Sequence, residues 1–262
     1  MRWLYFRRLA VAAALACGAV AHPAAAQPAP PLPPNVAQLE TMLAQKHYLE
    51  LGRILTQTKA ANDIVLNMNW ERTKMVAGAT AFINFNYAYD LWRIAAVLPP
   101  EQANSMRETA VMVLLYAYEL IVMDGVKCAD VSAPGHRQDQ IFASFAYIWK
   151  HVATLSEQQR AQLVDIAQRL EASTAAKRAD DDFLCRDGLD QMRDALARNG
   201  NKPLPESSPQ PGQIGKTVNV PANPDYQPKF VSKDVWQPKQ SALRVELPQR
   251  LQQLVQKAGA AK

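Results

Sequence analysis

Apolar residues recur at helical spacing along the chain and are densest between residues 70 and 123. Over Trp70–Leu98 they cover almost the whole circumference of a helix, which is typical of a helix buried on several sides. Gly78 is expected to mark a bend or a close contact within it, and a break is expected near Asn67–Asn69. Pro99-Pro100 ends this helix and opens the next, because proline suits a first helical turn. We therefore expect a central apolar helical hairpin.

The second helix of the hairpin contains a nearly continuous apolar run. From Ala110 to Met123 the sequence is AVMVLLYAYELIVM, and Glu119 is the only charged residue in it. The run is shorter than the ~20 apolar residues that span a bilayer. It therefore predicts a core helix, and no transmembrane segment is expected once the N-terminal region is removed.

Five further segments show helical periodicity, and no stretch before Gly200 alternates with the period of two typical of a strand. Ser156 followed by Gln159 is a capping-box signature, and Gly200 follows the last helix where glycine commonly ends helices. The pattern predicts an all-α, helical-bundle-like single domain of about six or seven helices over residues 35–200. The helices expected outside the hairpin are 36–43, 49–55, 137–153, 157–170 and 180–198.

The composition changes in the tail, residues 201–262. Nine of the 18 prolines of the chain fall here, which argues against regular structure through Gln240. Several large apolar side chains remain between residues 226 and 236, so we expect this stretch to lie extended against its own domain or a partner. A short helix over 247–255 is predicted to end the tail. The candidate binding residues of the tail are Tyr226, Phe230 and Trp236.

The first 26 residues have the three parts of a secretory signal peptide: a basic start, an apolar stretch and the small residues Ala24–Ala26 before the expected cleavage site. We therefore expect export to the periplasm, with residues 27–34 as a Pro/Ala-rich linker. A twin-arginine signal and a lipoprotein cleaved before Cys17 are weaker alternatives, because the surrounding residues fit those patterns poorly.

The net charge of +5 is unevenly distributed. Residues 27–200 contain 17 Lys/Arg and 20 Asp/Glu, whereas residues 201–262 contain nine Lys/Arg and four Asp/Glu. The body is thus mildly acidic and the tail is basic. A protein without a strongly basic face is a poor nucleic-acid binder, so no nucleic-acid partner is expected.

Two cysteines remain after the expected cleavage, Cys128 and Cys185. In an oxidising compartment two cysteines most simply form one disulfide bond. It would close a loop of 58 residues and contribute about 3–4 kcal/mol. The alternatives are two unrelated buried thiols, or a zinc site that also uses His136, whose spacing matches no zinc motif. We expect the disulfide.

The acidic cluster Asp180–Asp182, together with Asp187, is a candidate for binding calcium. Acids also suit a helix N-terminus, where they complement the helix dipole, and the stretch lacks the register of a calcium-binding loop. The helix interpretation is favoured, and no metal or other cofactor is expected. The sequence also contains no phosphate-binding glycine loop and no nucleophile motif.

Glu119 is a weak candidate for a catalytic group. A carboxyl group in an apolar run can have a raised pKa and act as a general acid, for instance in cleaving a cell-envelope polymer. The alternative is a structural carboxylate at the border of the core, paired with an arginine such as Arg93 or Arg107. The structural interpretation is favoured.

Aromatic residues form a stripe on the first helix of the hairpin: Phe82, Phe85, Tyr89 and Trp92 share one face at about 100° per residue. Such a stripe normally packs in the core. It could also line a groove for an apolar ligand or a partner peptide. Phe85, Tyr89 and Trp92 are therefore candidate binding residues.

The lack of a recognisable catalytic motif argues against an enzyme. The leading hypothesis is a non-catalytic binding protein of the cell envelope, which interacts with another envelope protein and can use its tail to dock in extended form. Two alternatives stand beside it. One is a cell-envelope polymer hydrolase with Glu119 as general acid, and the other is a carrier of an apolar ligand.

Overall fold

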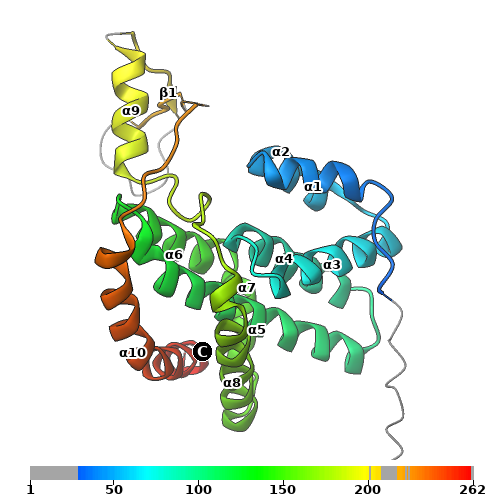
Figure 1. Ribbon diagram of the computed structural model, residues 1–262. Helices are drawn as coiled ribbons and strands as arrows, with labels where there is room; N and C mark the ends of the chain where they lie inside the picture. Colours follow the sequence, from blue (N-terminus) through cyan, green and yellow to red (C-terminus); the bar gives the residue numbers. More distant parts are fainter. Residues whose placement is uncertain (1–28, 201, 208–216, 222, 224, 261–262) are drawn as a thin grey trace, which may run out of the picture. The chain divides into compact units, whose positions relative to one another are not determined.

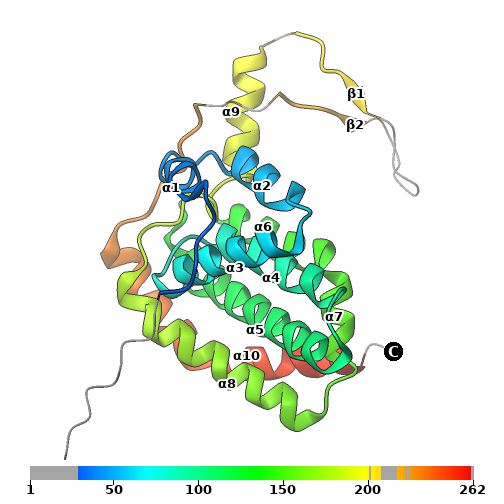
Figure 2. The same cartoon turned by 90° about the vertical axis from the view of Figure 1, so that its right-hand side faces the viewer.

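The structure is a computed structural model of the chain (Figures 1 and 2). The predicted signal peptide, residues 1–26, and Cys17 lie outside the residues that it describes. Residues 31–262 form one compact unit, and the description below refers to that unit. The described residues are 29–200, 202–207, 217–221, 223 and 225–260.

The described part of the chain is all-α, as predicted. It contains ten α-helices, two short 3₁₀ helices and one antiparallel ladder of two-residue strands. Nine of the α-helices lie in residues 35–200, all of which are described, so the predicted six or seven was too few. The elements are α1 (Val36–Ala44), α2 (Tyr48–Gln57), α3 (Ala61–Val76), α4 (Ala81–Ala95), α5 (Pro100–Asp124), η1 (Gly125–Lys127), α6 (Ser132–Ser144), α7 (Ala146–Val152), α8 (Glu157–Thr174), η2 (Ala175–Lys177), α9 (Leu189–Asn199), β1 (Glu206–Ser207), β2 (Thr217–Val218) and α10 (Lys233–Ala260).

The additional helices arise because two predicted helices are each divided. Gly78 separates α3 from α4, and its φ of +80° is a left-handed conformation that favours glycine. A Cβ at Gly78 would lie 3.1 Å from the Cβ of Lys177, so the position also marks a close contact. Phe145 separates α6 from α7. The predicted break near Asn67–Asn69 is wrong, because these residues lie within α3.

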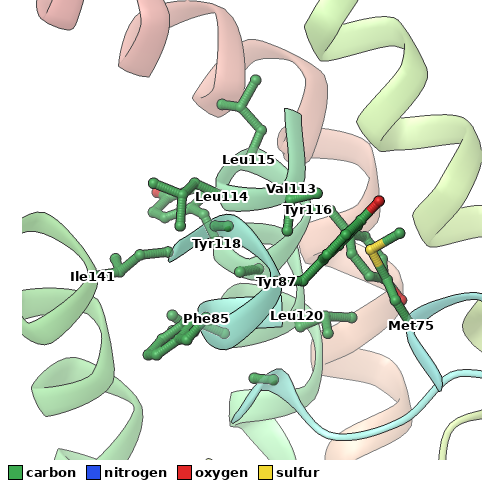
Figure 3. Packing of buried hydrophobic residues seen from close by; sticks show 14 of the residues in the cluster. Met75, Phe85, Tyr87, Val113, Leu114, Leu115, Tyr116, Tyr118, Leu120 and Ile141 are labelled. Carbon is green, nitrogen blue, oxygen red and sulfur yellow. The ribbon is translucent and has the colours of Figure 1, made fainter. Parts of the chain in front are cut away.

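The pair α4 and α5 lies at the centre of the core. The two helices pack against each other, and α5 also contacts α6, α7, α8 and α10. Figure 3 shows the buried side chains there, with Tyr116 and Leu120 of α5 near Tyr87 of α4. Within the described residues, one helical stretch, Pro100–Lys127, is long and apolar enough to cross a membrane. However, 78% of its 18-residue apolar stretch is buried inside the protein. Burial in the core accounts for this composition.

Several predicted helix ends are confirmed. α5 ends at Asp124, one residue after the apolar run that predicted it, and α9 ends immediately before Gly200, whose φ is +60°. Ser156 and Gln159 form the predicted capping box at the start of α8, where the Gln159 backbone N–H donates to the Ser156 hydroxyl at 3.2 Å. The local sequence alone specifies these ends, because each depends on residues that are neighbours in the chain.

The predicted start of the last helix of the body is wrong. α9 begins at Leu189 and not at Asp180, because the intervening segment makes contacts elsewhere. Asp181 accepts a hydrogen bond from the backbone N–H of Ala81 at 2.7 Å, and so satisfies an N–H at the start of α4. The segment before α9 therefore caps another helix and does not extend its own.

The predicted disulfide bond between Cys128 and Cys185 is present, with a Cα–Cα distance of 5.2 Å. It joins the segment after α5 to the segment before α9, and both cysteines are buried. The backbone of Cys128 also pairs with Phe230 in an isolated antiparallel bridge. The disulfide is thus close to the place where the C-terminal segment meets the body.

The C-terminal helix is longer than predicted. α10 has 28 residues and includes Pro238 and Pro248, whereas we expected a short helix after Gln240. Proline inside a helix removes a hydrogen bond and bends the axis, and α10 is visibly bent in Figure 1. Tertiary packing offsets this cost, since one face of the helix is buried. The buried residues of α10 are Leu247, Leu251 and Val255.

Candidate functional site

Aromatic side chains from several segments meet in one cluster. Phe82 and Phe85 on α4 contact Phe183, which precedes α9, with ring centroids 5.3 and 5.7 Å apart. Tyr48 on α2 lies 5.2 Å from Phe82. Phe145, between α6 and α7, lies 5.7 Å from Phe85. Tilted and edge-to-face ring contacts of this kind are favourable, so the cluster forms a well-packed floor.

A groove lies along this floor, and we call it the aromatic groove. Its first part has a volume of about 350 Å³ and its second part about 770 Å³, sizes typical of ligand sites. The two parts adjoin because they share Thr56, Phe82, Gln140 and Phe183. The first part is further lined by Phe85, Tyr89 and Tyr147, and the second by Lys46, Arg53, Arg137 and Arg186.

Arg137 on α6 fixes one wall of the second part. Its Nε donates to the carbonyl oxygen of Phe183 at 2.9 Å, and its guanidinium lies 3.9 Å from the centroid of the Phe183 ring. A further nitrogen pairs with Asp187 at 2.6 Å. Because only 3% of the Arg137 side chain is exposed, we conclude that it positions Phe183 and leaves ligand binding to other cations.

Three other cations make the second part positively charged. Lys46 and Arg186 share one partner, the buried carboxylate of Asp182. Arg53 on α2 is exposed and has no ion-pair partner among the described residues. The four cations of this part thus outnumber the two carboxylates that pair with them, Asp182 and Asp187. An excess of one sign of charge in a groove attracts a ligand group of the opposite sign.

Two tyrosines of the groove, Tyr48 and Tyr147, are uncharged at neutral pH. Burial raises the pKa of Tyr147 to about 12, and the neighbouring Tyr89 adds to this effect. Burial also raises the pKa of Tyr48, as do the nearby carboxylates of Asp181 and Asp182. The phenols can therefore offer hydroxyl hydrogen bonds to a ligand, but they are not available as bases.

Of the three candidates on α4, two line the aromatic groove. Phe85 and Tyr89 lie in its first part. Trp92 does not line it, and its indole instead contacts Tyr147 at 5.3 Å between ring centroids. Phe85 is buried, whereas Tyr89 and Trp92 are half-buried. The stripe therefore contributes both to the core and to the wall of the groove.

The candidates in the tail lie on the protein itself. Two backbone hydrogen bonds of 2.9 Å join residues 127–129 to residues 229–231, so Phe230 is held in an extended segment. The ammonium group of Lys127 lies 5.2 Å from the centroid of the Trp236 ring. Tyr226 is half-buried. The stretch thus lies on its own body. The predicted extended conformation is wrong for Trp236, because α10 already begins at Lys233.

Glu119 is fully buried on α5, and neither carboxyl oxygen has a hydrogen-bond partner in the described structure. Burial raises its pKa to about 9; Glu171 adds to this effect, and Arg178 and Arg244 oppose it. Glu119 is therefore a neutral acid in the interior at pH 7. A general acid must reach its substrate, and Glu119 lines neither part of the aromatic groove. The hydrolase hypothesis gains no support from this position.

Three of the four acids considered for calcium, Asp181, Asp182 and Asp187, have protein partners. Asp181 accepts from the backbone of α4, Asp182 pairs with two cations, and Asp187 pairs with Arg137. In the part of the chain that the structure describes, no three His, Cys, Asp or Glu side chains gather closely enough to hold a metal ion. Their partners show that Asp181, Asp182 and Asp187 act as structural groups.

The groove also contains residues that sequence reasoning missed, notably Arg53, Gln140 and Phe183. They come from three separate segments, and only the tertiary fold brings them together. The sequence contains one indication for Phe183, because this residue lies two positions before Cys185, which we expected to form a disulfide bond. No protein-family model, curated protein or solved structure matches the chain. The functional argument therefore rests on the chemistry of the groove.

Proposed function

We propose that the protein is a non-catalytic binding protein of the cell envelope. It is exported to the periplasm by its signal peptide, residues 1–26. Its helical-bundle-like domain, residues 35–200, holds an extended segment of another envelope protein in the aromatic groove. The observation that carries this proposal is the joined groove, in which a packed aromatic floor continues into a positively charged part.

The two parts of the groove favour different side chains of the bound segment. The first part favours an aromatic or large aliphatic side chain, which can pack on Phe85 and Tyr89. The second part favours an acidic side chain, because Arg53 has no ion-pair partner in the described structure. An extended chain advances about 3.3 Å per residue. One acidic and one aromatic residue a few positions apart can therefore occupy both parts at once.

Three further observations support binding over catalysis. The candidate acid Glu119 is buried away from the groove. Two tyrosines that line the groove, Tyr48 and Tyr147, have raised pKa values and remain neutral. The disulfide bond is of the kind that persists in an oxidising compartment, which agrees with export.

Selection from a displayed library of random peptides tests the proposal. We expect enrichment of peptides that combine an acidic residue with an aromatic or large aliphatic residue within about six positions. Arg53→Glu should weaken a selected peptide about tenfold, or about 1.4 kcal/mol, because it places an anion where a free cation stood. Isothermal titration calorimetry measures both affinities, and the affinity should fall as salt is added.

A steric pair of variants provides the control. Thr56 lies where the two parts of the groove meet, so Thr56→Trp should abolish peptide binding. Thr41 on α1 is exposed like Thr56. The hydroxyl of each donates to the carbonyl oxygen four residues earlier, at 2.7 Å for Thr56 and 2.8 Å for Thr41. Thr41→Trp should therefore leave binding unchanged. Equal losses in the two variants, or selected peptides without acidic residues, would refute the proposal.

A further inference from the structure

A second groove lies between α6, α7 and the C-terminal half of α10, and we call it the α10 groove. It has two adjoining parts of about 330 and 570 Å³, which share Phe142, Leu254 and Lys257. None of the residues that line it also lines the aromatic groove. It is therefore a separate site that the proposed function does not use.

The chemistry of the α10 groove changes along its length. The smaller part is apolar and presents Phe142, Trp149 and Leu254, with Ala146 and Ala258 leaving room between them. The larger part is polar and presents the side-chain amides of three glutamines. The site therefore offers an apolar end joined to an end rich in hydrogen-bonding groups. The glutamines are Gln138, Gln249 and Gln253.

The charged side chains of the α10 groove are mostly cations. Arg250 pairs with Glu246 at 2.8 Å, so these two charges cancel. Lys150 on α7 and Lys257 on α10 are exposed, and neither has an ion-pair partner among the described residues. Lys257 lines both parts and so stands where the apolar end meets the polar end. The groove thus carries an excess of positive charge at this junction.

We propose that the α10 groove binds a single-chain anionic amphiphile of the fatty-acid type. Its hydrocarbon chain lies along Trp149 and Leu254, and its carboxylate lies at Lys257, within reach of the glutamine amides. The charge and polarity of the groove favour this class of ligand. An apolar ligand without an anionic group would leave the free lysines without a partner. A purely polar ligand would leave the apolar end of the groove exposed to water.

α10 makes this site possible, which gives the tail a role in binding. One face of its C-terminal half is anchored in the core, and Leu254 and Lys257 lie at the edge of that face. Removing α10 would remove one wall of the groove. The anchoring residues are Leu247, Leu251 and Val255.

Calorimetric titration of the full protein with dodecanoate and with dodecanol tests the proposal. We expect one saturable site for dodecanoate and at least tenfold weaker binding of the uncharged alcohol. The double variant Lys150→Glu/Lys257→Glu should lower dodecanoate affinity at least tenfold and leave dodecanol unchanged, because only the carboxylate uses the lysines. Lys239→Glu, at an exposed position on the same helix but outside the groove, should change neither.

Two steric variants locate the bound molecule. Ala146→Trp, at an exposed position that lines the apolar end, should abolish binding of both probes, whereas Thr56→Trp in the aromatic groove should leave dodecanoate binding intact. An unchanged melting temperature confirms that each variant is folded. The proposal fails if dodecanoate does not bind, if it binds no better than dodecanol, if Thr56→Trp abolishes its binding, or if only phosphatidylglycerol vesicles bind, which would indicate a membrane surface.

Discussion

Replacing Glu119 with glutamine is expected to stabilise the protein at pH 8 and to change its stability little at pH 5. The Glu119 carboxyl has a pKa of about 9 in the fold, against 4.5 for an unperturbed glutamate. Between these values the folded state keeps a proton that the unfolded state has lost. The contribution of Glu119 to stability is therefore greatest below pH 4.5 and falls as the pH rises to about 9. Glutamine has no proton to lose, so Glu119→Gln removes this part of the decline.

The size of the effect follows from the width of the pH window. Each pH unit between the two pKa values costs about 1.4 kcal/mol, so the variant should gain on the order of 3–4 kcal/mol between pH 5 and pH 8. Burial also raises the pKa of Glu71 and raises that of Asp90 to about 6. Because of these two carboxyls, the stability of the variant should still fall as the pH rises, but less steeply than that of the wild type.

Urea unfolding at several pH values between 5 and 8 measures this prediction. Asp139→Asn is a suitable control, because Asp139 is an exposed carboxylate on α6, and its removal should leave the pH dependence unchanged. If Glu119→Gln and the wild type lose stability in parallel as the pH rises, Glu119 is not a buried neutral acid.

Arg178→Met is expected to lower the free energy of unfolding by about 3–5 kcal/mol. Arg178 pairs with Asp124 at 2.6 Å and with Glu171 at 2.7 Å, and all three side chains are at most 4% exposed. Lys127 still pairs with Asp124 in the variant, but two buried carboxylates lose the cation between them. The loss of a partner from a buried ion pair is costly, because the remaining charges stay desolvated.

Arg244→Met provides the matched comparison, since it removes a second partner of the same Glu171. The Arg244 side chain is 41% exposed, so solvent screens its pairing, and the expected loss is below about 1 kcal/mol. Urea unfolding of both variants at pH 7 measures the difference. Equal losses would contradict a buried ion-pair network centred on Arg178.

Sequence reasoning succeeded where structure depends on neighbouring residues or on covalent chemistry. The capping box of Ser156 and Gln159 and the glycine after α9 are local signals, and both were found correctly. The disulfide followed from the two cysteines that remain after the expected signal-peptide cleavage. The apolar run around Glu119 predicted a core helix because so little of its surface is polar.

Sequence reasoning failed where a contact with a distant part of the chain overrides the local pattern. Asp181 caps α4 from outside that helix, so the acidic cluster does not open α9 where its composition suggested. α10 continues through Pro238 and Pro248 because one of its faces is buried against the body. Proline content argued against regular structure through Gln240, because composition contains no information about that burial.

The candidate site was predictable only in part, for the same reason. The stripe on α4 located Phe85 and Tyr89, because helical spacing places them on one face. The cations of the groove come from the turn between α1 and α2, from α2, from α6 and from the segment before α9. Arg53 lies in a short amphipathic helix with no unusual pattern, so its position beside the aromatic floor appears only when the helices are packed.

Photo-crosslinking in the cells that naturally produce the protein tests the central claim most directly. A photoreactive amino acid replaces Leu49, which lines the aromatic groove and is 91% exposed, or Val245 on α10, which is 83% exposed and lines neither groove. The account predicts one discrete adduct from position 49, joined to an acidic segment of an envelope protein, which disappears when Arg53→Glu is added. No adduct, or the same adducts from both positions or with Arg53→Glu present, would contradict it.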